Sequence, residues 1–94
     1  MMLRGNHECR QLATYFNFKQ ETLVKYDEEI FNHFMTSFDS LPIACILNER
    51  FLVIHGGISP EIKTIAELQK LKRFQEPPKE GGFWYIHGIR CYPI

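Results

Sequence analysis

The clearest pattern of apolar and polar positions lies near the middle of the chain. Between residues 30 and 38 apolar side chains recur at helical spacing and form one face: Ile30, Phe31, Phe34, Met35 and Phe38. Asp27 precedes them as a good N-cap, and Glu28 and Glu29 favour the positive end of a helix. Pro42 ends the helix, because proline disfavours helical backbone in the residue before it. The pattern predicts an amphipathic helix that buries this face and leaves His33 in solvent.

Two short apolar runs follow this helix. Residues 43–47 and 51–54 are apolar and the polar residues 48–50 separate them, which predicts a β-hairpin. Both runs are apolar without alternation, as strands buried on both faces are. We therefore expect the helix at 30–38 to pack against the hairpin, with Phe34 buried in the contact.

Weaker patterns predict further helices on both sides. Residues 8–16 and 18–26 combine helix-forming residues with apolar positions. Thr64 and Glu67 have the spacing of a capping box, which predicts a helix over residues 65–74. Helices combined with a hairpin place the chain in the α/β class.

Composition narrows the range of functions. The 94 residues make at most one small domain, and a hydrophobic fraction of 45% excludes a disordered chain. Eleven basic residues balance eleven acidic ones, so no electrostatic argument favours a nucleic acid or a membrane surface. Three widely spaced cysteines, Cys9, Cys45 and Cys91, are expected to be free thiols in a reducing, intracellular (cytoplasmic) compartment. We expect Cys9 to be a partly buried helix residue and Cys45 a small core residue.

Candidate chemistry gathers in two glycine-containing stretches that follow apolar runs. Asn6 offers an amide oxygen and His55 an imidazole nitrogen, a mixture that divalent metals accept. His7, beside Asn6, is a candidate proton donor, and Gly5 allows close approach of the backbone. Two simpler interpretations stay open: Asn6 and His7 in a surface turn, and His55 as a structural residue.

The same stretches resemble a known enzyme family. Leu3-Arg4-Gly5-Asn6-His7-Glu8 resembles the Gly-Asn-His-Glu signature of the metal-dependent serine/threonine phosphoprotein phosphatases. Residues 51–60, with His55-Gly56-Gly57, resemble their later His-Gly-Gly segment, in the right order and at a matching distance. Residues 15–21 and 73–78 resemble the calcineurin branch more than its sister phosphatases. The resemblance covers about residues 2–78. It implies that residues 1–78 are a central segment of a calcineurin-like metallophosphoesterase fold and that 79–94 are a divergent tail.

The resemblance implies a function and a set of roles. The family hydrolyses phosphoserine and phosphothreonine in proteins with two metal ions, iron and zinc or manganese, which activate a bound water. By this resemblance Asn6 and His55 are ligands of one metal, and His7 is the general acid that protonates the leaving oxygen. Glu8 is expected to fix the loop by hydrogen bonds. Intact relatives in this branch also bind a calcium-binding regulatory subunit and calmodulin, whose docking regions have no match here.

Several family motifs have no counterpart in this sequence. The Asp-x-His and Gly-Asp-x-x-Asp-Arg-Gly motifs, which supply further ligands, are absent from the sequence, and so is the acidic partner of the general acid. We therefore expect the chain to be inactive alone. The alternatives are a non-catalytic interaction fragment, a truncated gene product and a small autonomous metal-binding protein.

The resemblance also predicts a geometry. The backbone before Gly5 and before His55 should be strands that end on the same side of the fold. The Asn6 amide oxygen and a His55 ring nitrogen should then lie close enough to share an ion through bonds of roughly 2.0–2.2 Å each. His7 should face the same cleft without binding the metal.

Overall fold

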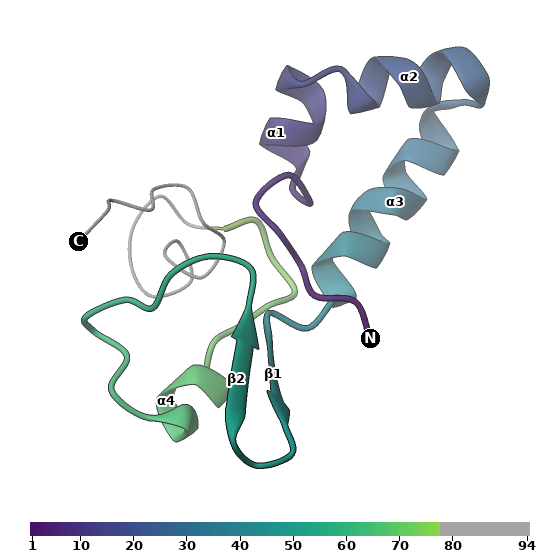
Figure 1. Ribbon diagram of the computed structural model, residues 1–94. Coiled ribbons are helices and arrows are strands. Elements are labelled where there is room, and N and C mark those ends of the chain that lie inside the picture. Colours follow the sequence, from purple (N-terminus) through teal and green to yellow (C-terminus); the bar gives the residue numbers. More distant parts are fainter. Residues whose placement is uncertain (78–94) are drawn as a thin grey trace.

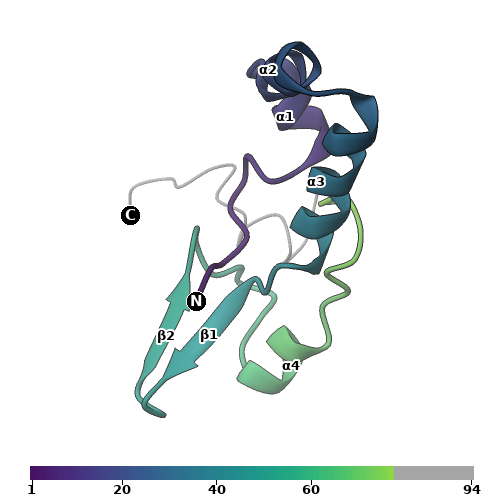
Figure 2. The same cartoon turned by 90° about the vertical axis from the view of Figure 1, so that its right-hand side faces the viewer.

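The computed structural model describes residues 1–77, which form two groups of elements (Figure 1). The first group holds the helices α1 (Arg10–Tyr15), α2 (Phe18–Lys25) and α3 (Glu28–Ser40). The second holds the strands β1 (Ala44–Leu47) and β2 (Phe51–Ile54) and the helix α4 (Ile65–Gln69). Residues before α1 run between the two groups, and α4 lies beside the hairpin (Figure 2). The expected tail, 79–94, lies outside the described residues.

The longest helix, α3, begins and ends where the sequence predicts. The Asp27 carboxylate accepts a hydrogen bond from the backbone N–H of Ile30 at 2.9 Å, which confirms the N-cap. The helix ends at Ser40, and the following residue, Leu41, is already extended before Pro42. His33 is exposed, as expected.

The apolar face of α3 packs on helices rather than on the hairpin. Phe31 and Met35 are buried with Ala13 of α1, and Phe18 and Phe38 pack against this cluster. The expected packing against the hairpin is therefore wrong, and Phe34 is 38% exposed, with its ring edge-on to Phe18 at 5.3 Å. Asn17 adopts a left-handed backbone with φ 69°, which sets α2 at an angle to α1, so that Phe18 at the start of α2 reaches the apolar face of α3.

The hairpin has the predicted strands and a tight turn. β1 and β2 are antiparallel, with Ala44 opposite Ile54 and Leu47 opposite Phe51. Asn48 and Glu49 both have positive φ, and Arg50 N–H donates to the Leu47 carbonyl at 3.1 Å.

The strands are not buried on both faces, so that expectation is wrong. Leu47 and Phe51 are 59% and 61% exposed, and Cys45 is only partly buried. One small cluster covers the hairpin: the buried Ile43 with Ile54, Ile62, Leu68 and Leu71. α4 lies beside the hairpin and contributes Leu68 to this cluster, but much of the apolar surface of the hairpin stays uncovered.

The helices α1 and α4 are shorter than predicted, α1 at both ends and α4 at its C-terminal end. Thr64 and Glu67 form the predicted capping box, but α4 ends at Gln69 rather than at residue 74. Lys70 and Leu71 N–H donate to carbonyls only three residues back, and farther on the carbonyls of Arg73 and Gln75 accept hydrogen bonds from a distant side chain. Cys9 is the N-cap of α1 rather than a residue within it. Among the described helices, none has the length and apolar character needed to cross a membrane.

Candidate functional site

Asn6 and His55 meet in space although they lie 49 positions apart in the sequence. His55 Nε2 and Asn6 Oδ1 are 3.0 Å apart, so the predicted convergence of these side chains is confirmed. β2 delivers His55 directly after its last residue, Ile54. An amide oxygen only accepts hydrogen bonds, so the ring donates from Nε2 in this arrangement.

The expected strand before Gly5 is not formed. The chain at residues 1–5 has no regular secondary structure, but the Arg4 N–H donates to the Pro42 carbonyl at 2.8 Å. This single backbone bond ties the segment to the residues that lead into β1. The loop that follows lies alongside the end of β2, where the His55 ring is next to Gly5.

Gly5 is the point of closest approach between the two stretches. A β-carbon on Gly5 would lie 3.0 Å from Cε1 and 3.1 Å from Nδ1 of His55, and 2.7 Å from the Glu8 carboxylate. The Gly5 N–H donates to that carboxylate at 2.9 Å. Glu8 therefore fixes the loop by a hydrogen bond, as expected, and only glycine leaves room for both side chains.

Two further bonds close the loop of residues 5–8 on itself. Glu8 N–H donates to the Gly5 carbonyl at 3.3 Å, and the Cys9 thiol donates to the Asn6 carbonyl at 3.3 Å. The Cys9 sulfur also accepts from Leu12 N–H at the start of α1. Burial raises the pKa of the Cys9 thiol, while the hydrogen bond from Leu12 acts in the opposite direction. Cys9 is thus a neutral structural thiol that holds the backbone of Asn6.

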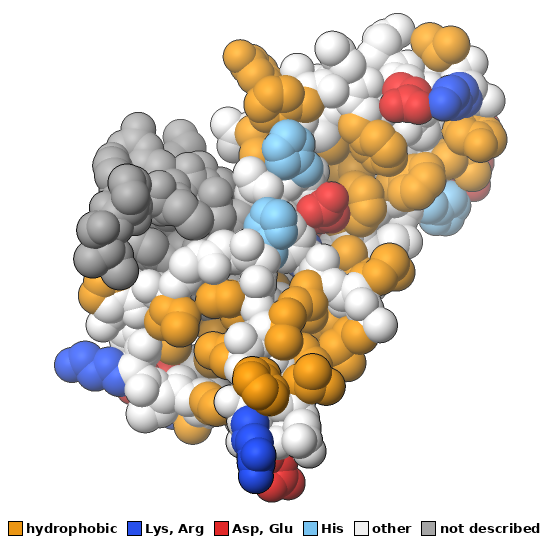
Figure 3. Space-filling view, in the orientation of Figure 1, with side chains coloured by type: hydrophobic (Ala, Val, Ile, Leu, Met, Phe, Trp, Pro, Cys, Tyr) orange, Lys and Arg blue, Asp and Glu red, His pale blue; other side chains and the backbone are white. Residues whose placement is uncertain are grey.

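His7 points to a neighbouring hollow. Its side chain is exposed, and its ring centroid lies 4.8 Å from that of Phe16. The hollow is also lined by Glu8, Leu12 and Phe38. Figure 3 shows two histidine side chains close together with an acidic side chain beside them and an apolar area next to them, while a third histidine lies farther away on the same face. His7 makes no ion pair with a described acidic residue.

The donor atoms of Asn6 and His55 fit two ligands of one ion. Two bonds of about 2.1 Å that meet at about a right angle place their donor atoms about 3.0 Å apart, and the observed separation is 3.0 Å. The residues 1–77 contain no group of three or more His, Cys, Asp and Glu side chains arranged for a metal. The pair is therefore suited to part of a ligand set rather than to a complete one.

Sequence reasoning missed the ionic network behind the loop. Arg4 is fully buried, and its Nε donates to the Glu8 carbonyl at 2.8 Å. Its Nη2 pairs with Asp39 at 3.0 Å, while Nη1 donates to the carbonyls of Arg73 and Gln75 at 2.9 and 3.0 Å. Burial lowers the pKa of Arg4, and Asp39 opposes that effect. The only sequence signal was the position of Arg4 within the quoted motif.

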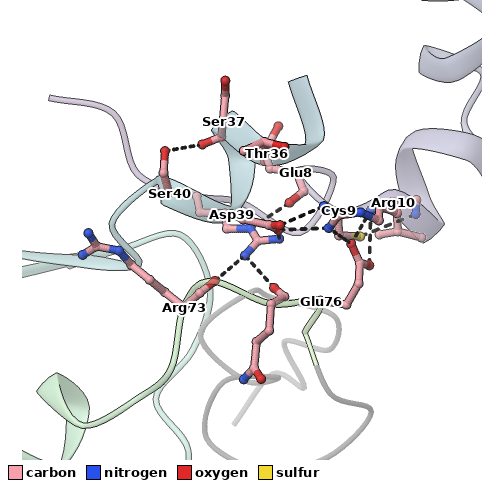
Figure 4. A network of polar contacts seen from close by, with 12 residues as sticks. Glu8, Cys9, Arg10, Thr36, Ser37, Asp39, Ser40, Arg73 and Glu76 are labelled. Carbon is pink, nitrogen blue, oxygen red and sulfur yellow. Dashed lines mark hydrogen bonds and ion pairs between the residues drawn. The ribbon is translucent and has the colours of Figure 1, made fainter. Parts of the chain in front are cut away.

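Arg10 extends this network at the surface. Its guanidinium pairs with Asp39 and with Glu76, each at 2.8 Å, and these hydrogen bonds raise its pKa (Figure 4). Glu76 also accepts from the Arg10 backbone N–H at 2.9 Å, at the N-terminal end of α1. Asp39 therefore stands between two arginines, one buried and one exposed.

Comparisons with known proteins match the part of the chain that contains these residues. A family model described as calcineurin-like phosphoesterase matches residues 1–89. The chain belongs to the calcineurin-like phosphoesterase family. The α/β fold expected from the sequence is accordingly the partial fold of this family, with helices and a small antiparallel sheet.

Relatives of this chain are named serine/threonine-protein phosphatases. It is 49% identical over 80 residues to serine/threonine-protein phosphatase 2B catalytic subunit A1 of Saccharomyces cerevisiae, covering 85% of this chain and 14% of that protein. It is 41% identical to serine/threonine-protein phosphatase SIT4 of Candida albicans, over 87% of this chain and 26% of the relative.

A solved structure shares the fold. A protein serine/threonine phosphatase from S. cerevisiae with similarity to human phosphatase PP5 superposes with a TM-score of 0.87 at 37% identity. The match covers 92% of this chain and 28% of that one. The chain thus spans only a seventh to about a quarter of the length of these relatives.

Proposed function

We propose that this chain supplies part of the centre of a metal-dependent serine/threonine protein phosphatase of the calcineurin branch. The observation that carries the proposal is the 3.0 Å separation of Asn6 Oδ1 and His55 Nε2. Family membership and the phosphatase names of the relatives support the reaction type. The substrates are phosphoserine and phosphothreonine proteins in the cytoplasm, and the metals are iron and zinc, or manganese.

The proposed roles rest on the family resemblance and are supported by the positions of the groups. Asn6 and His55 hold one ion with an amide oxygen and an imidazole nitrogen. A bound ion supplies charge that polarises a phosphate oxygen and lowers the pKa of a water ligand. For Nε2 to bind an ion, the neutral ring must carry its proton on Nδ1. His7, exposed beside this pair, donates a proton to the leaving oxygen.

The ligand pair predicts weak binding and no turnover by the chain alone. Two ligands hold a divalent ion far less tightly than the three or four protein ligands of a complete site. A phosphothreonine peptide with Mn²⁺ should therefore remain uncleaved by the 94-residue chain. Turnover that His55→Ala abolishes would contradict the proposed inactivity while supporting the assigned site.

Paramagnetic Mn²⁺ offers a direct test of the ligands. In NMR spectra of the full chain, substoichiometric Mn²⁺ should broaden signals of Asn6 and His55 first. His55→Ala should remove this broadening. His33→Ala is the matched control, because His33 is an exposed histidine on α3 with Glu29 nearby at 3.7 Å. Equal loss of broadening in both variants would show scattered surface binding and refute the assigned pair.

A second candidate function is a non-catalytic interaction surface. The exposed apolar side chains of the hairpin, Leu47 and Phe51, favour it, because large apolar surfaces mark contact sites. In the calcineurin branch the partner to test is the calcium-binding regulatory subunit. We expect no capture of that subunit by the chain in a pull-down, and capture that Phe51→Lys abolishes would favour this second function.

A further inference from the structure

We propose that Arg4 is a positioning residue for the Asn6–His55 pair, acting through Glu8 and Gly5. The inference rests on the proposed metal role of that pair. Arg4 touches neither member of it in the hydrogen bonds of the described residues. Its contribution is to fix the backbone on which Asn6 lies and beneath which His55 packs.

The first step runs from Arg4 to Glu8. The Nε of a fully buried guanidinium donates to the Glu8 carbonyl at 2.8 Å. A buried arginine with its donors satisfied has little freedom, because any rotation leaves a charged donor without a partner. The end of the loop is therefore held at a defined place in the interior.

The second step runs from Glu8 to the ligand pair. The Glu8 carboxylate accepts the Gly5 N–H at 2.9 Å and would lie 2.7 Å from a β-carbon on Gly5. The His55 ring lies on the same side of Gly5, within 3.0 Å of that β-carbon position. A shift of Glu8 therefore changes both the backbone that carries Asn6 and the surface on which the His55 ring rests.

The third step explains what holds Arg4 itself. Asp39 near the end of α3 provides the counter-charge at 3.0 Å, and the carbonyls of Arg73 and Gln75 take the remaining Nη1 bonds. Two distant parts of the chain, the end of α3 and the segment 73–75, thus converge on the Arg4 guanidinium. Substituting a group that orients metal ligands in this way typically lowers the metal affinity 10- to 100-fold.

Arg4→Lys is the sharpest variant. Lysine keeps the positive charge for Asp39 but has no donor at the Nε position, so the Glu8 carbonyl loses its partner. Arg10→Lys is the matched control, because Arg10 pairs with the same Asp39 and makes no hydrogen bond to the loop of residues 5–8. Met35→Ala controls for general destabilisation, since Met35 is buried in the separate helical cluster.

Two measurements on the full 94-residue chain decide the matter. In the metal-free chain, the ¹⁵N signals of the His55 ring report whether Nε2 carries the ring proton and donates it in a hydrogen bond to Asn6. In a titration with Mn²⁺ alone, the broadening at His55 gives an apparent affinity. Arg4→Lys should shift the ring signals toward a mixture of tautomers and weaken Mn²⁺ binding by about tenfold or more. Arg10→Lys and Met35→Ala should leave both readouts near those of the unaltered chain.

The outcomes separate this inference from the proposed function. Unchanged His55 signals and Mn²⁺ affinity in Arg4→Lys would overturn the positioning role, and so would equal changes in Met35→Ala. If the unaltered chain shows no Mn²⁺ broadening at His55, the metal role fails. The ring signals of the metal-free variants then still decide whether Arg4 positions the pair.

Discussion

The imidazole ring of His55 rests on Gly5, so closely that a β-carbon there would lie 3.0 Å from the ring carbon Cε1. Gly5→Ala should therefore push the ring and the Glu8 carboxylate away from their places. We expect the His55 signals to shift, Mn²⁺ broadening at His55 to be lost and the free energy of unfolding to fall by about 1–3 kcal/mol. A folded Gly5→Ala chain with unaltered His55 signals would show that the contact is not required.

The helical cluster gives a prediction about two neighbouring residues of α3. Met35 is 2% exposed and Phe34 is 38% exposed. Met35→Ala should lower the free energy of unfolding by about 2–5 kcal/mol, and Phe34→Ala should lower it less because its ring already meets water. Urea unfolding of both variants measures the order. A larger loss for Phe34→Ala would indicate that the face of Phe34 is covered in solution.

The hairpin turn contains a residue with an unfavourable backbone. Glu49 has φ 54°, in the left-handed region that costs a non-glycine residue about 1–2 kcal/mol. Glu49→Gly removes this cost and should therefore raise the free energy of unfolding by roughly 1 kcal/mol. The greater freedom of glycine in the unfolded chain acts in the opposite direction and reduces the gain. Arg50→Gly is the control, since Arg50 has no positive φ and gains nothing from glycine. In thermal unfolding, the change in Tm relative to the unaltered chain should have opposite signs in the two variants, with the rise in Glu49→Gly.

The buried thiol of Cys9 makes stability depend on pH. Burial raises its pKa in the folded chain, so the unfolded chain releases the thiol proton first as pH rises. The contribution of Cys9 is intact below the ordinary thiol pKa of about 8.5 and is lost progressively above it. We expect the free energy of unfolding to fall more between about pH 7 and about pH 9.5 in the unaltered chain than in Cys9→Ser, which does not ionise there. Parallel losses in both chains would contradict this linkage.

Local chemistry in the sequence was sufficient for most of the elements. Short-range hydrogen bonds between neighbouring residues set two helix starts, at Asp27 and at the pair Thr64 and Glu67. The two apolar runs on either side of residues 48–50 set the hairpin. The sequence also determined which residues form the candidate pair, because the Gly-Asn-His-Glu and His-Gly-Gly motifs contain Asn6 and His55, whose donor atoms lie 3.0 Å apart. Their metal role stays a prediction.

Tertiary structure alone decided what those elements pack against. An apolar stripe such as that of α3 shows that a face is buried but not by what, and here the left-handed Asn17 brings α2 to it instead of the hairpin. The course of the chain after α4 was likewise set at a distance, because Arg73 and Gln75 give their carbonyls to Arg4. A buried charge is stable only where several acceptors converge. That convergence spans 71 positions between Arg4 and Gln75, and no local pattern encodes it.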